Sequence, residues 1–213
     1  QHVLPSPRAL FGLATNMIPF LQNNQGNRAM TAAKQQEQAV PLLHREPPLV
    51  QVQTDKDKTF EEIVGRNASR HAPVDGVVSE VKNDAVVVTA PDGKKHEVQI
   101  YRNFALKGHT LYDSEVRVKP GQKVKRGELL ADSTFTKDGV LSLGINLETA
   151  YMPFHGLNYE DGIVISETAA KKLTSLHVKP HEVPSKAGRV YSRKHFLSQY
   201  PHIYSKEQVA NIG

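Results

Sequence analysis

The chain has 213 residues, of which 38% are hydrophobic and 23% charged, and its formal net charge is +5. That length allows one or two domains with a real core, but the low apolar fraction indicates either much loop or surface that expects a partner. The positive charge favours contact with a polyanion. The absence of cysteine excludes disulfides, thiolate zinc sites and a cysteine nucleophile, and it fits a reducing cytoplasm.

The N-terminal part is predicted to be helical. A Ser-Pro pair and apolar residues at three-to-four spacing predict a first helix over roughly residues 6–21. Residues 27–39 contain no proline and are rich in Ala, Gln, Lys and Arg, which predicts a second, more polar helix. Prolines between residues 41 and 48 and a charged loop at 54–58 end this helical part.

The middle of the chain is predicted to be β. Residues 74–88 and 97–100 are rich in valine and flank a Pro-Asp-Gly turn, so they predict a hairpin. Residues 116–130 place apolar side chains around two further glycine turns.

Three more strands are expected at residues 139–145, 149–154 and 162–166. The segment that follows is basic and contains helix-like patches at 169–176 and 205–210. This tail resembles the start of another module.

The second helix carries the first set of candidate binding residues, Arg28, Lys34 and Gln38. Because each residue advances about 100° around a helix, Arg28 and Gln38 lie about 80° apart, on one broad face. Taken without further context, a solvated helix face is the commoner explanation. The functional interpretation is a helix whose guanidinium and amide groups grip phosphates and nucleotide edges.

The β region has the turn chemistry of a barrel-sandwich hybrid, in the stretches 71–81 and 118–131. This pattern also occurs in biotinyl and lipoyl carrier domains, where a hairpin presents a modified lysine. Here the turn reads Asp-Gly-Lys-Lys-His at 92–96 and lacks the flanking residues of a carrier lysine. This absence makes a carrier or structural module the second interpretation, and we keep it as the alternative function.

An adjacent acidic pair, Glu160 and Asp161, stands in a loop between an aromatic, glycine-containing run and a β-branched segment. Such a pair is usually structural or solvated. A functional pair would bind a hard cation such as Mg²⁺ through carboxylate oxygen, often together with a substrate phosphate.

These blocks together resemble the β subunit of multisubunit DNA-dependent RNA polymerases. The segment 143–167 matches in order the family stretch that ends in its Asn-aromatic-Glu-Asp and Ser-Glu signature, and residues 124–132 fit the segment just upstream. The N-terminal part matches separately, through the runs Ile18-Pro19-Phe20-Leu21, Asn27-Arg28-Ala29 and Gln38-Ala39-Val40-Pro41.

The resemblance implies an α+β, mainly β fold: part of a double-psi β-barrel, an inserted barrel-sandwich-like module and an N-terminal helical pair. The expected divisions are residues 1–50 for the helical part, 51–132 for the inserted module, 133–167 for the barrel segment with the acidic loop, and 168–213 for the start of a flap-like region.

The resemblance also implies roles in nucleotidyl transfer. Arg28 would contact the triphosphate of the incoming nucleotide, Gln38 would lie near the RNA end, and Lys34 is a further candidate for substrate binding. Glu160 and Asp161 would lie near the second, substrate-associated Mg²⁺, directly or through water, while the primary metal ligands belong to the partner subunit. The implied partners are a β′-like subunit, the remaining β segments, DNA template, RNA and nucleoside triphosphates, with no membrane.

Departures from the cellular pattern favour a divergent enzyme of the kind that some large phages encode, often with β split between separate polypeptides. Asn24 and Gln25 replace an acidic pair, Phe154 replaces a tryptophan, and Glu148 stands where the family has arginine. The three-aspartate catalytic loop of β′ is absent from this sequence, so the chain is not expected to polymerise RNA alone. A polymerase-derived scaffold is the third interpretation, and the presence of Arg28, Gln38 and the acidic pair argues against it.

Overall fold

The computed structural model describes residues 10–54, 57–106, 110–179, 192–200 and 203–204. The chain divides into two compact units, Gln1–Lys179 and Pro180–Gly213. Within the described part of the second unit lies one helix, α5 (Arg193–Gln199), which Ser192 caps by accepting a hydrogen bond from the His195 N–H. All candidate site residues belong to the first unit. In the described part of the chain no helix is long and apolar enough to cross a membrane.

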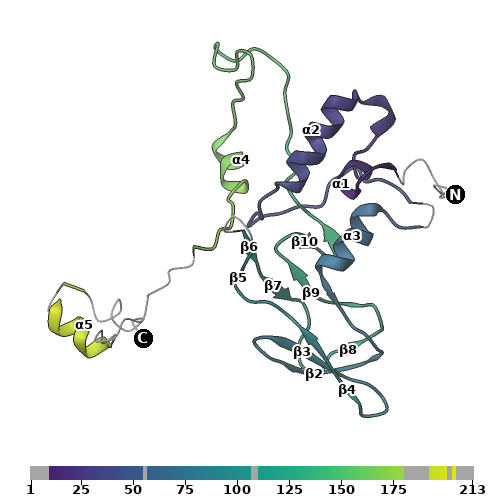
Figure 1. The fold of residues 1–213 in the computed structure, drawn as a ribbon, viewed down its shortest axis with the longest axis vertical. Coiled ribbons are helices and arrows are strands. Elements are labelled where there is room, and N and C mark those ends of the chain that lie inside the picture. Colours follow the sequence, from purple (N-terminus) through teal and green to yellow (C-terminus); the bar gives the residue numbers. More distant parts are fainter. Residues whose placement is uncertain (1–9, 55–56, 107–109, 180–191, 201–202, 205–213) are drawn as a thin grey trace. The chain divides into compact units, whose positions relative to one another are not determined.

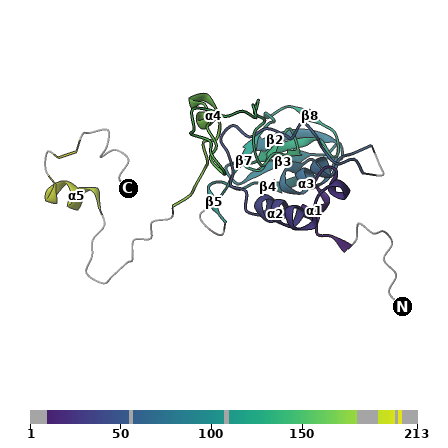
Figure 2. The ribbon, with the colours of Figure 1, turned by 90° about the horizontal axis from the view of Figure 1, so that it is seen from above.

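The described residues of the first unit form four α-helices and one 3₁₀ helix (Figure 1). They are α1 (Leu13–Asn16), η2 (Leu21–Asn23), α2 (Gly26–Glu37), α3 (Phe60–Ala68) and α4 (Glu167–Lys172). Figures 1 and 2 both show α1 beside α2. The buried face of α2 consists of Ala29 and Ala33, whose small side chains permit close approach. Its other side faces solvent, which leaves polar residues available.

The strands of the described residues form four antiparallel sheets. Their bounds are β1 (Arg70–His71), β2 (Gly76–Val81), β3 (Ala85–Thr89), β4 (Lys95–Gln99), β5 (Phe104–Ala105), β6 (Leu111–Tyr112), β7 (Ser114–Val116), β8 (Lys123–Val124), β9 (Leu129–Ser133), β10 (Thr136–Lys137) and β11 (Val140–Leu141). The largest sheet has the order β4-β3-β2-β8, and a second has the order β1-β9-β7. The mainly β fold class predicted from the sequence is confirmed.

One apolar core joins these two sheets. Strand β3, one of the two inner strands of the four-stranded sheet, is buried along most of its length. A fully buried aliphatic side chain contributes about 1.5–3 kcal/mol, so this cluster is the main source of stability of the β region. Its members are Ala72, Val78, Val86, Val88, Ile100, Val118, Val124, Leu130 and Ala131.

A buried carboxylate fixes the turn that follows β9. Asp132 accepts hydrogen bonds from the Thr136 hydroxyl (2.9 Å), from the N–H groups of Asp138 and Gly139 (both 2.9 Å) and from the Arg117 guanidinium (3.0 Å). Four donors satisfy a charge that would otherwise be costly to bury. Asp132 therefore holds the turn together and is not free to bind a ligand.

The sequence-based element predictions need correction in the N-terminal half. The first helix is wrong in extent, because within the described residues it is one turn, Leu13–Asn16, and the chain then bends at Pro19 and at Phe20, whose φ is 54°. The segment 74–88 contains two strands instead of one, with a turn between Val81 and Ala85. The second helix and the β3–β4 turn are confirmed.

The helical part also does not end at residue 58, since α3 follows directly. Its start has a capping box in which Thr59 accepts from the Glu62 N–H (3.2 Å) and the Glu62 carboxylate accepts from the Thr59 N–H (2.9 Å). Gly65 lies against β11 so closely that a side chain there would collide with the backbone of Gly139 and Leu141.

Two of the three late strands are absent as well. Residues 149–154 and 162–166 form no strand, and within 139–145 only β11 and an isolated bridge from Gly144 to Glu46 are formed. Helix α4 ends at Lys172, so the predicted helix at 169–176 is too long. The predicted patch at 205–210 lies outside the described residues.

The structure predicts an unusual pH response from Glu61, which is buried in α3 and accepts a hydrogen bond from the Val52 N–H (3.2 Å). Burial raises the pKa of this carboxyl above its ordinary value near 4.5, because desolvation disfavours its charged form. The folded chain then binds the proton more tightly than the unfolded chain. The resulting stabilisation is full below the unfolded pKa and is lost as pH rises through the folded pKa.

We therefore expect Glu61→Gln to flatten the pH dependence of the free energy of unfolding above about pH 4.5. The same variant should have a higher free energy of unfolding than wild type at neutral pH. Glutamine keeps an oxygen for the Val52 N–H and never ionises. Urea unfolding of the chain at several pH values measures this, with Glu148→Gln, at an exposed position outside the helix, as the charge control. A Glu61→Gln curve parallel to wild type would contradict the prediction.

Candidate functional site

The exposed side of α2 carries the three predicted substrate-binding residues. Arg28 lies in the first turn of the helix, is exposed, and makes no hydrogen bond or ion pair with any residue that the structure describes. Lys34 is paired with Glu37 at 3.7 Å, and both side chains are largely in solvent. Gln38 caps the C-terminus, where its N–H donates to the carbonyls of Lys34 and Gln35. The side chains of all three are accessible to a ligand.

The acidic pair stands at the tip of a long loop, residues 147–165. The Asn158 side chain closes the turn: its oxygen accepts from the Phe154 N–H (2.9 Å) and its amide donates to the Met152 carbonyl (2.6 Å). Glu160 follows two residues later with φ 53°, a left-handed conformation uncommon for a residue other than glycine.

A second contact holds the same turn. The N–H of Gly162 donates to the Tyr159 carbonyl (3.0 Å), and a Cβ at Gly162 would crowd the Leu157 carbonyl at 3.0 Å. A side chain at position 162 would have to push this carbonyl aside by a few tenths of an ångström, so the turn favours glycine. Glu160 and Asp161 themselves are exposed and have no polar partner among the described residues, so their carboxylates are held in place by the turn but remain free to bind.

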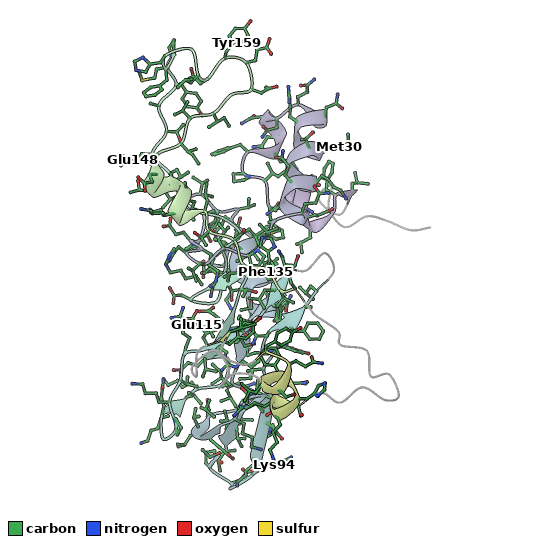
Figure 3. The ribbon with its side chains drawn as sticks, turned by 90° about the vertical axis from the view of Figure 1, so that its left-hand side faces the viewer. Met30, Lys94, Glu115, Phe135, Glu148 and Tyr159 are labelled. Atoms are coloured by element: carbon green, nitrogen blue, oxygen red, sulfur yellow. The ribbon has the colours of Figure 1, made fainter. Side chains whose placement is uncertain are left out.

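Helix α2 and the acidic loop project from the same end of the first unit. Figure 3 shows Tyr159 at the loop tip and Met30 on α2 toward that end, whereas Lys94 lies at the opposite end. Figure 1 places the loop and α2 in the same way. No hydrogen bond or ion pair joins the two elements in the part of the chain that the structure describes.

Both elements are nevertheless attached to one extended segment, residues 41–46, that follows α2. The Glu46 N–H donates to the Gly144 carbonyl (2.8 Å) just before the loop. After the loop, the Leu43 N–H donates to the Thr174 carbonyl (2.9 Å), and the Leu176 N–H donates to the Pro41 carbonyl (2.8 Å). The cationic helix and the carboxylate loop therefore share one attachment.

The donor set of the loop fits a cation that has other ligands as well. Two adjacent carboxylates can supply oxygen to a hard cation or to its bound waters. Among the described residues, no three His, Cys, Asp or Glu side chains gather to hold a metal ion. Glu160 and Asp161 can therefore supply only part of a cation's ligands, and the remaining ligands would come from other groups.

Apolar side chains on the loop are left uncovered by the described residues. Tyr151 is 99% exposed, Ile163 84% and Tyr159 79%. Several exposed apolar side chains on one loop are typical of an interaction surface. The remaining exposed apolar residues of this loop are Leu147, Met152, Phe154, Leu157, Val164 and Ile165.

Fold and site together define a class: a mainly β chain with one uncovered apolar loop that carries an acidic turn and a cationic helix at the same end. The particular family follows from comparison with known proteins. Residues 14–212 match the family model described as RNA polymerase Rpb2, domain 6, and the chain belongs to this family. The match is consistent with a double-psi β-barrel region.

Curated relatives agree with the family model. The chain is similar to the DNA-directed RNA polymerase subunit beta of Thermus thermophilus, with 38% identity over 185 residues, 85% of this chain and 16% of that subunit. The Thermus aquaticus subunit is 39% identical over the same shares, and that of Tropheryma whipplei is 35% identical over 201 residues, 89% of this chain and 16% of the subunit. The chain thus spans about one sixth of these relatives, and the resemblance inferred from the sequence is confirmed.

Proposed function

We propose that this chain is a segment of the β subunit of a DNA-directed RNA polymerase, to which it contributes residues that bind nucleotide phosphate and lie near Mg²⁺. It has no activity by itself and works as part of the assembled nucleotidyltransferase. The observation that carries this proposal is the common attachment of α2 and the acidic loop to residues 41–46. Family membership supports the coarser role in RNA synthesis.

On α2, each residue type suits one part of the substrate. The Arg28 guanidinium offers a planar fork of donors that matches the oxygens of a triphosphate, and Lys34 adds a mobile point charge nearby. Exchange of its Glu37 pairing for phosphate costs little, since exposed ion pairs are weak. Gln38 supplies an amide that can donate to, and accept from, the RNA end.

On the loop, Glu160 and Asp161 hold oxygens toward the same substrate. Bound Mg²⁺ would neutralise developing charge on the phosphates, and its primary ligands are expected on the partner subunit. The two carboxylates orient the waters or oxygens around the substrate-associated ion. Asn158 and Gly162 fix the turn that presents them.

The partners follow from what this chain leaves uncovered. We propose that the remaining β segments cover the apolar side chains of residues 147–165, and that a β′-like subunit faces the acidic turn, with DNA and RNA nearby. The divisions at residues 50, 132 and 167 are proposed as the boundaries of the helical part, the inserted module and the barrel segment. The assembled enzyme is proposed to act in the cytoplasm.

The test is affinity labelling of the assembled polymerase with a nucleoside triphosphate analogue that reacts with amines through its γ-phosphate. Label is expected on the α2 peptide at Lys34, and unmodified nucleoside triphosphate should compete it away. Lys94, an exposed lysine at the other end of the unit, is the internal control. Equal labelling of both lysines, or labelling that ATP does not reduce, would exclude the proposed contact.

A carrier function has one observation in its favour: Lys94 follows the β3–β4 turn and is exposed, as a modified lysine would be. Mass spectrometry of the chain from its natural source separates the two functions. A biotinyl or lipoyl adduct on Lys94 or Lys95 would establish the carrier, and unmodified lysines are expected for the polymerase segment.

A further inference from the structure

The acidic loop reaches far from the sheets, so the position of its carboxylates depends on how its two ends are held. Backbone hydrogen bonds join both ends of the loop to residues 41–46. One side chain adds contacts on both sides of the loop. That side chain is Glu46, at the end of the same extended segment.

The Glu46 carboxylate binds the residue at which the loop begins. One oxygen, Oε2, accepts from the Asn146 N–H at 2.9 Å and from the Asn146 side-chain amide at 3.1 Å. The same amide also donates to the Pro47 carbonyl at 3.0 Å. Asn146 is thereby held in position and orientation, since both its backbone and its side chain are engaged.

The second oxygen binds the helix that follows the loop. Glu46 Oε1 lies 3.7 Å from the Lys172 ammonium, in the last turn of α4. Helix α4 is fixed at its other end by Ser166, which accepts from the Ala169 N–H (3.1 Å). A single carboxylate therefore contacts the segment before the acidic loop and the helix after it.

Apolar packing at this end of the loop is incomplete. The position of the loop end therefore depends more on its polar contacts. A cavity of about 400 Å³ lies between the loop end and α2, lined by Gly144 and Asn146 on one side and by Ala32 and Gln36 on the other. Side chains do not fill this space, so dispersion contacts do not fix the loop against the helix. Hydrogen bonds that Glu46 accepts from Asn146 hold the loop end to the extended segment that follows α2 instead.

The charge of Glu46 agrees with this arrangement. The backbone hydrogen bond from Asn146, followed by the side-chain bond and the charge of Lys172, lowers the pKa of this carboxyl below its ordinary value. The contacts are thus made to the ionised form, and charge-assisted hydrogen bonds are the stronger kind.

We propose that Glu46 is a positioning residue for nucleotide addition: by binding Asn146 and Lys172 together, it sets where the Glu160–Asp161 turn stands relative to α2. This inference rests on the proposed function of the acidic turn. Glu46 itself touches neither substrate nor metal in this role. Loss of its contacts moves or loosens the carboxylates while Arg28 and the nucleotide contacts of α2 remain intact.

The test uses the assembled polymerase and single-turnover extension of a preformed RNA–DNA scaffold. Glu46→Ala is expected to reduce the maximal rate about tenfold, the effect of one charge-assisted hydrogen bond, with an unchanged apparent KM for nucleotide. Glu46→Gln keeps an oxygen for both Asn146 donors and should recover most of that loss. Lys172→Ala should cost only about two- to threefold, because exposed ion pairs are weak.

The matched control is Lys171→Ala. This residue neighbours Lys172 in α4 and makes an exposed ion pair with Glu167 at 3.0 Å, but it does not touch Glu46. It should extend RNA at the wild-type rate. Hydrogen exchange of residues 147–165 in the assembled enzyme should be faster in Glu46→Ala than in Lys171→Ala, with equal assembly of both.

A combined variant tests whether Glu46 acts through the Glu160–Asp161 turn or supports the structure in some other way. If Glu46 acts through the acidic turn, Glu46→Ala slows wild type about tenfold but hardly slows a variant that already lacks Glu160 and Asp161. A full tenfold loss in both backgrounds, or unchanged hydrogen exchange, would overturn the positioning role. Wild-type rates in the variant without Glu160 and Asp161 would instead refute the proposed function of the turn itself.

Discussion

Replacing Glu160 and Asp161 together with alanine is expected to slow nucleotide addition by roughly 100-fold in the assembled enzyme, the scale of a lost contribution to metal-ion catalysis. The defect should shrink as Mg²⁺ is raised, because part of the lost contribution is occupancy of the substrate-associated ion. Assembly and DNA binding should persist. Both side chains are exposed and have no polar partner among the described residues, so neither builds the core.

Single-turnover extension of a preformed RNA–DNA scaffold across a Mg²⁺ titration measures this effect. Glu148→Ala is the matched control, since it removes one exposed carboxylate from the start of the same loop, away from the turn. It should behave as wild type. Wild-type rates of the double variant at every Mg²⁺ concentration would refute the site, and failure to assemble would assign the pair a structural role.

The β region and α2 could be predicted from sequence because their signals are local. Valine-rich alternation, the Pro-Asp-Gly turn and an alanine-rich helix each determine structure within a few residues. The fold class was therefore confirmed. Helix α3 also has a local signal, because the capping box of Thr59 and Glu62 is visible in the sequence. It was missed because the charged run at residues 54–58 was interpreted as the end of the helical part.

The strands expected at 149–154 and 162–166 failed for a different reason. A strand exists only when another strand pairs with it, and no described segment of this chain pairs with the loop. Their apolar residues face outward instead, as the nearly complete exposure of Tyr151 shows. The apolar pattern of residues 149–154 and 162–166 is typical of strands. It does not predict which segment would pair with them.

Sequence motifs identified the candidate site residues. They did not identify the contacts that hold these residues in place. Glu160 and Asp161 are adjacent in sequence, so a pattern can find them. Glu46 and Asn146 are separated by 100 positions and meet only in the folded chain. Neither local periodicity nor the composition of the proline-rich stretch 41–48 indicated that its glutamate holds the acidic loop.

Arg28→Ala is expected to raise the apparent KM for nucleoside triphosphates roughly 10- to 100-fold in the assembled polymerase, with a much smaller effect on DNA binding. The reason is geometric. Arg28 lies on the solvent-facing side of α2, opposite the buried Ala29 and Ala33, and no described residue engages its guanidinium. Its removal therefore leaves the helix packing unchanged and takes away only donors for a ligand.

Two further variants decide what Arg28 recognises. Arg28→Lys keeps the charge but loses the planar fork, so it should recover only part of the KM defect if two phosphate oxygens are bound at once. Arg126→Ala removes the same charge at an exposed position of the β region, outside the proposed site, and should leave the KM unchanged. Steady-state extension at varied nucleotide concentration, beside DNA binding at fixed salt, measures all three. An unchanged KM for Arg28→Ala with a collapse of DNA affinity would assign this residue to template binding, because a phosphate contact on the template weakens DNA binding whatever nucleotide is present.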